Sequence, residues 1–217
     1  MPIKRSYAEL GDACATAHAV ELIGDRWTYP ILRELMLGPK RFVELAEGLI
    51  GVTPAVLTAR LRALQDAGLV ERVDLPAPTR ATGYCVTPWG QELRPLLNAL
   101  GRWAMDSPTR DDDGGLTPDG TVQSMLTMAP STPPTAPVEV GLLLHDARIE
   151  APRPYEFRLT WDDELAIVRE PATDAPARVT GDSTTWAGVL YDGVPLDEVD
   201  VDGDVDEVRR LVAAFAA

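Results

Sequence analysis

The sequence contains few of the residues that build disulfide frameworks and metal sites, with only two cysteines and two histidines among 217 residues. Two cysteines, Cys14 and Cys85, cannot form the disulfide framework of a small secreted domain, so we expect a cytoplasmic protein. The cysteines and histidines also stand at spacings unrelated to any known metal-binding pattern. We therefore expect no metal ion and no other cofactor.

Long apolar runs and enzyme motifs are missing as well. The chain has no apolar stretch of about 18 residues, the length that a membrane-spanning helix needs, and the N-terminal MPIKRSYAELGD lacks the apolar core of a signal peptide. It has no phosphate-binding loop, no dinucleotide fingerprint and no G-x-S-x-G motif. We expect neither a membrane segment nor an enzyme.

Basic residues are outnumbered, with 20 Lys and Arg against 34 Asp and Glu and a formal net charge of −14, which argues against a nucleic-acid partner. The charge is unevenly distributed, however. Residues 1–110 carry 2 Lys and 11 Arg against 12 acidic residues, a net charge of +1, whereas residues 111–217 carry 7 Arg against 22 acidic residues, a net charge of −15. This asymmetry predicts two domains, of which only the first can present a basic face to phosphates. We place them at 1–106 and 117–217, joined by a linker over 107–116.

Residues 41–90 follow the order of a winged helix-turn-helix. Helices are predicted over 17–23 and 27–37, and a third, short helix over 41–49 is followed by a turn. The next helix begins at Thr53-Pro54, because threonine is a good N-cap and proline a favoured first helical residue. Two alternating segments around a proline-rich tip then predict a β-hairpin. The supporting helix, the recognition helix and the wing thus follow one another in the order that a winged helix requires.

Several side chains of this module are placed to contact DNA. The recognition helix enters the major groove by its first turns, the supporting helix presents its amino end to a phosphate, and the wing tip reaches the backbone or the minor groove. The candidate DNA-binding residues are Lys40, Arg41, Thr53, Thr58, Arg60, Arg62 and Arg80. Each arginine taken singly has a simpler interpretation, in which it only solvates a helix face.

Residues 14–104 resemble the HxlR family of winged-helix transcriptional regulators, relatives of the MarR group. The resemblance rests on LIGDRWTYPILREL (22–35), GPKRFVEL (38–45), GVTPAVLTARLRALQDAGLVER (51–72) and YCVTPWGQELRPLL (84–97). It implies a cytoplasmic homodimer that binds a pseudo-palindromic double-stranded DNA operator and has no catalytic activity. In one departure from the family, Ala55 and Val56 stand where members often carry a basic residue.

A helix predicted from Pro88 to Ala104 has a wide apolar stripe. Such a stripe packs against its own domain or against a second copy of the chain, and the second copy agrees with the homodimer that the resemblance implies.

Cys14 matches the position of a redox-sensing cysteine in some family members, although Ala15 follows it where proline is usual. A thiol senses oxidants only if it is accessible and its pKa is lowered. Redox sensing through Cys14 and a small packed thiol are both open interpretations.

Residues 117–217 predict an α+β domain, so that the whole chain belongs to the α+β class. Residues 177–215 resemble the sterol carrier protein type-two fold, a small domain that encloses an apolar cavity. The resemblance implies an apolar ligand in a cavity lined by Met125, Met128, Phe157, Trp186 and Leu190. The same five residues are equally compatible with an ordinary core.

Two classes of function follow from these patterns. The first is a DNA-binding regulator, modulated by an apolar ligand in its second domain or by the Cys14 thiol. The second is a carrier of apolar ligands that does not bind DNA and uses its winged helix as a scaffold for protein contact and dimerisation. Loss of DNA affinity with rising salt separates the two, because only phosphate contacts release counterions.

Overall fold

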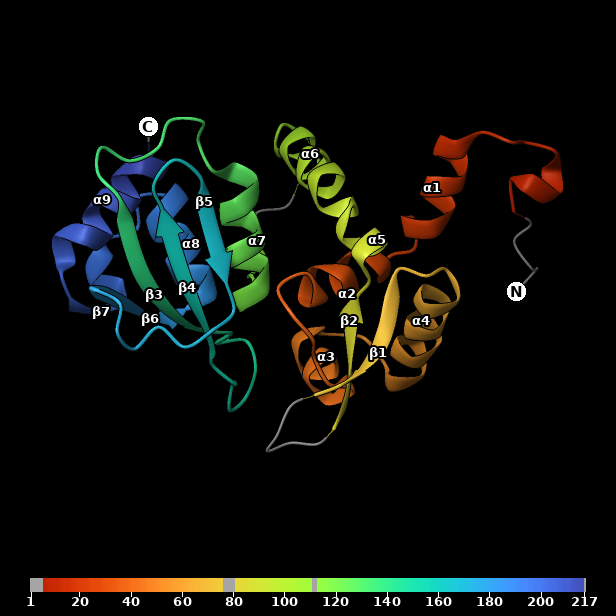
Figure 1. Cartoon of the computed structure of the whole chain (residues 1–217), viewed down its shortest axis with the longest axis horizontal. Coiled ribbons are helices and arrows are strands. Elements are labelled where there is room, and N and C mark those ends of the chain that lie inside the picture. Colours follow the sequence, from red (N-terminus) through yellow and green to blue (C-terminus); the bar gives the residue numbers. More distant parts are fainter. Residues whose placement is uncertain (1–5, 76–80, 111–112, 217) are drawn as a thin grey trace. The chain divides into compact units, whose positions relative to one another are not determined.

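A computed structural model describes residues 6–75, 81–110 and 113–216 of the chain. The chain divides into two compact units, Met1–Leu93 and Arg94–Ala217. Figure 1 shows the helices and strands of both units along the chain.

The first unit is a winged helix-turn-helix, as its sequence predicts. Its strands pair antiparallel, from Val70 opposite Val86 to Asp74 opposite Thr82, and Lys40 adds a single bridge to Tyr84. Its helices and strands are, in order, η1 (Ala8–Leu10), α1 (Ala15–Ile23), α2 (Thr28–Leu35), α3 (Phe42–Gly48), α4 (Pro54–Asp66), β1 (Val70–Asp74), β2 (Thr82–Val86) and α5 (Pro88–Gln91).

The recognition helix α4 owes its bounds to local chemistry. The Thr53 hydroxyl accepts a hydrogen bond from Val56 N at 3.3 Å, and Pro54 occupies the first turn, where a missing N–H costs little. Gly68 ends the segment with a φ of +73°, a conformation that glycine adopts without steric cost. One face of α4 is buried in the core through Leu57, Leu61 and Leu64.

The prediction of a single helix from Pro88 to Ala104 is wrong in one respect, because the structure has two helices there. The first, α5, ends at Gln91, and α6 spans Leu93–Met105. Pro95 has no N–H to donate to the carbonyl of Gln91, and its ring crowds that carbonyl. The break therefore falls one turn before this proline.

The helix α6 is grouped with the second unit, where it packs on α7 (Pro118–Met128). The Thr127 hydroxyl donates to Asn98 Oδ1 at 3.1 Å, and Arg102 Nη1 donates to the Thr127 carbonyl at 3.0 Å. The division after Leu93 thus differs from the expected boundary at residue 106, because these polar contacts attach α6 to α7.

The second unit is built on a five-stranded sheet in the order β5-β4-β3-β6-β7. The pairing of β3 with β6 is parallel, and the other pairs are antiparallel. After α7 the elements are β3 (Val138–His145), β4 (Tyr155–Trp161), β5 (Leu165–Val168), β6 (Ala177–Asp182), α8 (Ser183–Tyr191), η2 (Leu196–Glu198), β7 (Asp200–Gly203) and α9 (Val205–Phe215).

The two faces of this sheet differ in chemistry. Helices α7, α8 and α9 cover one face, and the strands bury their apolar side chains beneath them (Figure 1). The other face is polar, with ion pairs between Arg158 and Glu139 and between Arg178 and Glu156. This alternation is the period-two pattern from which the strands were predicted.

Candidate nucleic-acid interface

The outward face of α4 is lined with small side chains. They border a shallow hollow of about 560 Å³, formed by Pro54, Ala55, Thr58, Ala59, Arg62, Ala63 and Asp66. Arg62 is exposed and has no hydrogen-bond or ion-pair partner within the described parts of the chain. Small residues beside one free guanidinium let the helix backbone approach a groove closely while the arginine extends toward it.

Arg60 lies on the flank of α4, outside the lining of that hollow. Its Nη2 is 2.7 Å from Asp25 Oδ2, in the turn between α1 and α2. The two arginines of the recognition helix, predicted to act together, are therefore in different environments.

The two threonines of α4 are both exposed. Thr53 is the N-cap, and its hydroxyl oxygen already accepts from Val56 N. Thr58 lines the hollow, and its Oγ1 donates to the Pro54 carbonyl at 2.8 Å. The Thr58 oxygen keeps acceptor capacity toward solvent, because a hydroxyl has two lone pairs.

The basic residues at the start of α3 differ in accessibility. Arg41 is half-buried, and both its backbone N and its Nε donate to Glu44 Oε2, at 2.8 and 3.0 Å. Lys40 is only 2% exposed, and its Nζ donates to Glu34 Oε2 at 2.6 Å. The backbone pairing of Lys40 with Tyr84 turns the lysine side chain toward the interior. The phosphate contact predicted for Lys40 is thus inconsistent with its burial. Arg80 lies outside the described residues.

The two thiols are in contrasting surroundings. Cys14 is exposed at the N-cap of α1, where hydrogen bonds from the backbone of Ala17 and Thr16 lower its pKa. Cys85 is half-buried in β2, and burial together with the nearby Glu71 carboxylate raises the pKa of its thiol. Of the two, Cys14 has the more reactive setting.

Comparison with known proteins agrees with this geometry. Residues 22–112 match the model of the HxlR-like helix-turn-helix family. An uncharacterized HTH-type transcriptional regulator of Synechocystis sp. is 34% identical over 98 residues, which are 45% of this chain and 73% of that protein. The chain belongs to the HxlR-like helix-turn-helix family.

Other matches cover a similar share of the chain. An uncharacterized HTH-type transcriptional regulator of Mycobacterium tuberculosis is 37% identical over 89 residues, which are 41% of this chain and 56% of that protein. The reduced form of the regulator YodB from Bacillus subtilis, a solved structure, covers 46% of this chain and 100% of its own, with 31% identity and a TM-score of 0.42. The family model and the two sequence relatives each match less than half of the chain, so the family assignment concerns the winged-helix part.

Three acidic residues of this HxlR-like module escaped the sequence analysis. Each forms an ion pair with a predicted DNA-binding residue. The pairs are Asp25 with Arg60, Glu34 with Lys40, and Glu44 with Arg41. Only the pair of Arg41 and Glu44 had a signal in the sequence, since residues three apart are neighbours at a helix start. The other two carboxylates meet their partners through the tertiary fold.

The residues predicted to line a ligand cavity lie in or beside the core of the second unit. Met125, Phe157, Trp186 and Leu190 are buried, and Met128 is half-buried. The indole Nε1 of Trp186 is buried and has no hydrogen-bond partner among the described residues. A hollow of about 390 Å³ at the surface of this unit is lined by residues 137–139, 160–164 and Glu207, and by none of those five.

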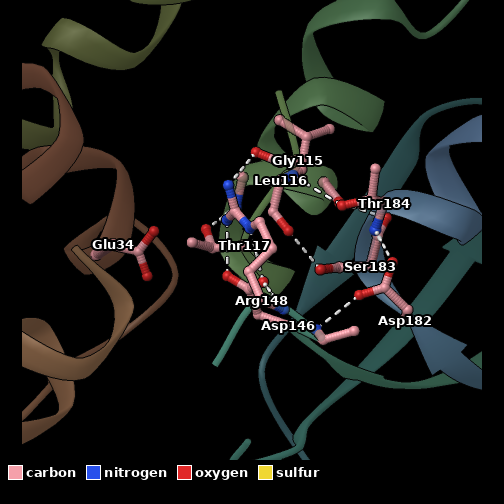
Figure 2. A network of polar contacts seen from close by, with 12 residues as sticks. Glu34, Gly115, Leu116, Thr117, Asp146, Arg148, Asp182, Ser183 and Thr184 are labelled. Carbon is pink, nitrogen blue, oxygen red and sulfur yellow. Dashed lines mark hydrogen bonds and ion pairs between the residues drawn. The ribbon is translucent and has the colours of Figure 1, made fainter. Parts of the chain in front are cut away.

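The segment that precedes α7 is fixed by polar contacts with α8 and the loop after β3. Figure 2 shows Arg148 and the first residues of α8 around the segment Gly115–Leu116. Arg148 Nη1 donates to the Gly115 carbonyl at 2.6 Å, Leu116 N donates to Thr184 Oγ1 at 2.9 Å, and Ser183 Oγ donates to the Leu116 carbonyl at 2.5 Å. This part of the predicted linker is therefore structured.

Two aspartates hold the partners of that segment in place. The carboxylate of Asp146 accepts from Nε and Nη2 of Arg148, at 2.8 and 2.7 Å, the fork geometry of a strong arginine pair. Asp182 caps α8 and also accepts from Ala147 N at 2.8 Å (Figure 2). The segment that precedes α7 is thus linked to the ends of β3 and β6.

Across the described ranges, no three His, Cys, Asp or Glu side chains gather as metal ligands, and no helix is long and apolar enough to cross a bilayer.

Proposed function

We propose that the chain is a DNA-binding transcriptional regulator that contacts a pseudo-palindromic operator as a homodimer, with the outward face of α4 in the major groove. The hollow lined by small side chains beside the exposed Arg62 carries this proposal. Arginine is the commonest reader of guanine, because its fork donates to O6 and N7 together. The names of the HxlR-like relatives, HTH-type transcriptional regulators, support the same function.

The homodimer is supported by an uncovered apolar stripe on α6. Leu96, Leu100 and Trp103 are exposed, Trp103 by as much as 77%. A second copy of the chain would bury this stripe, and the two recognition helices of such a dimer would have to lie about 34–36 Å apart to reach successive half-sites.

The experiment is a binding titration over a range of salt concentrations. The probe is a duplex that the full-length chain selects from a random-sequence library. We expect Arg62→Gln to weaken binding about tenfold and to change the preferred base at one position in each half-site. Arg209→Gln, an exposed arginine of α9, is the matched control and should leave affinity and preference unchanged. Failure of the wild-type chain to bind any duplex at low salt would favour the carrier that uses its winged helix for protein contact.

For the second unit we propose a non-enzymatic, sterol-carrier-like binding domain for an apolar ligand. Its support is the apolar layer beneath α7, α8 and α9, together with the unpartnered indole of Trp186 within it. A ligand with an apolar body and one acceptor oxygen would satisfy that donor. Mass spectrometry of the natively purified protein tests the idea: we expect a co-purifying lipophilic molecule, and its loss in Leu190→Arg.

A second means of regulation is favoured by the setting of Cys14. Its exposure and lowered pKa suit a thiol that attacks a disulfide, forming a mixed disulfide and releasing one thiolate. Oxidised glutathione should then alter DNA binding by the wild-type chain but not by Cys14→Ser. An equal effect on both proteins would exclude Cys14 as the sensor.

A further inference from the structure

The carboxylate of Asp25 connects two helices of the winged-helix unit. Its Oδ1 accepts from Trp27 N at 3.0 Å, at the start of α2, and its Oδ2 is paired with Arg60 Nη2 at 2.7 Å, in the middle of α4. The residue before it, Gly24, closes α1 by donating its N–H to the Val20 carbonyl at 2.7 Å. The turn that ends α1 and starts α2 is thereby fastened to the recognition helix.

Arg60 is oriented toward the protein. Its side chain is 30% exposed, its Nη2 is committed to Asp25, and its Nε is buried without a hydrogen-bond partner in the described part of the structure. Reading a guanine requires both donors of the guanidinium fork to point outward. Arg62, two residues along the helix, is exposed, whereas one donor of Arg60 is committed to Asp25.

The packing of α4 in the core sets which face of the helix points inward. Its core face is held by leucines, and apolar contact is non-directional. A recognition site must hold its reading side chains to within about 0.5 Å of the productive geometry. A directional ion pair on the flank of the helix adds a second constraint on its rotation to the one that leucine packing gives.

We propose that Arg60 is a positioning residue, which together with Asp25 sets the rotation of α4 in the groove and leaves base reading to Arg62. This inference rests on the proposed DNA-binding function of α4. It also couples α1 to the recognition helix, because Asp25 follows directly on the end of α1.

A double-mutant cycle on the full-length chain tests the proposal. The variants are Asp25→Asn, Arg60→Gln and the two combined, with Arg62→Gln as the matched control. On the duplex selected by the wild-type chain, we expect each single change to weaken binding about tenfold and the combined variant to be no weaker than either. Arg62→Gln should instead multiply the effect of Asp25→Asn. Arg60→Lys should recover part of the affinity, since it keeps the charge.

Sequence preference supplies a readout that a purely structural role would not produce. Repeating the selection with Arg60→Gln should return the wild-type consensus, whereas Arg62→Gln should return an altered one. The proposal is overturned if the effects of Asp25→Asn and Arg60→Gln multiply. It is also overturned if Arg60→Gln changes the consensus while Asp25→Asn does not.

The experiment distinguishes an error in the proposed DNA-binding function from an error in the proposed role of Arg60 and Asp25. If the wild-type chain selects no duplex, the proposed function is wrong. The cycle is then measured by urea unfolding of the same four proteins, and additive losses of stability would overturn the pair as well.

Discussion

The two cysteines differ in how much thiolate each supplies near neutral pH. Backbone hydrogen bonds lower the pKa of Cys14, whereas burial and Glu71 raise that of Cys85. Since the thiolate is the nucleophile, its fraction at a given pH is larger for the thiol of lower pKa.

We therefore predict that iodoacetamide alkylates Cys14 well before Cys85 at pH 7, as followed by peptide mass spectrometry. The alkylation rate of Cys14 should level off at a lower pH than that of Cys85, because thiolate formation is complete sooner. Unfolding in urea should bring the two rates together. Equal rates in the folded protein would contradict the environments described for the two thiols.

Lys40 and Glu34 form a buried pair in which neither side chain is more than 2% exposed. Removing one member leaves the other charge buried, which typically costs about 3–5 kcal/mol. Because Arg33 also contacts Glu34, at 3.0 Å, we place the loss for Lys40→Met near the lower end of that range.

The predicted loss of stability for Lys40→Met is measured by urea unfolding. Arg41→Gln is the matched control, because its pair with Glu44 is partly exposed and such pairs contribute about 0–1 kcal/mol. Equal losses for the two variants would show that Lys40 is less buried than described.

The basic residues of the winged helix show which side-chain contacts sequence patterns cannot predict. Spacing identified the helix that carries both Arg60 and Arg62 and the segment that carries Lys40. It could not identify the carboxylate of Asp25 or Glu34, because those contacts are made by packing between elements. Arg60 and Lys40 were therefore grouped with Arg62, although the fold engages them elsewhere.

At the scale of elements, α6 combines an attached face with an uncovered one. Asn98 and Arg102 bind Thr127, while Leu100 is 50% exposed. Burying a leucine side chain contributes about 1.5–3 kcal/mol, so a charge at this position weakens any association made through the stripe.

We predict that Leu100→Glu shifts the monomer–dimer equilibrium at least about tenfold toward monomer, as measured by light scattering over a range of concentrations. Val168→Glu is the matched control. Val168 is 48% exposed on β5 and lies outside the stripe, so its replacement should leave the equilibrium unchanged. A dimer that survives Leu100→Glu would mean that α6 is not its interface.

Elements with strong local signals were predicted well. The helix α4 has a threonine cap, a first-turn proline and a terminal glycine, and its bounds followed from these residues. The edge strand β7 was not predicted, although Val199 and Val201 alternate with acidic residues there. Its antiparallel pairing with β6 comes from the tertiary fold, and so many acidic residues in so short a segment suggest a turn.

At the scale of the whole molecule, residues 111–217 carry a net charge of −15, against +1 for residues 1–110. Its field reaches DNA only over the screening length of the solvent, about 30 Å at 0.01 M salt and about 8 Å at 0.15 M. The acidic residues of the second unit should therefore oppose non-specific binding mainly at low ionic strength.

We predict that neutralising the exposed turn between β4 and β5, by Asp162→Asn, Asp163→Asn and Glu164→Gln together, increases affinity for an unrelated duplex several-fold at about 0.01 M salt. The increase should vanish near 0.15 M. Fluorescence anisotropy with a labelled duplex measures both conditions, and an effect that persists at the higher salt would indicate direct contact with DNA.

The buried indole of Trp186 makes the second unit observable by optical spectroscopy. Trp161 and Trp186 lie in its core, whereas Trp103 is exposed on α6, so the fluorophores report on different surroundings. Replacing Trp103, together with Trp27 and Trp89 of the first unit, by phenylalanine would leave Trp161 and Trp186 as the tryptophans that emit. A molecule that binds there and accepts a hydrogen bond from the Trp186 indole would then shift the wavelength of maximum tryptophan emission.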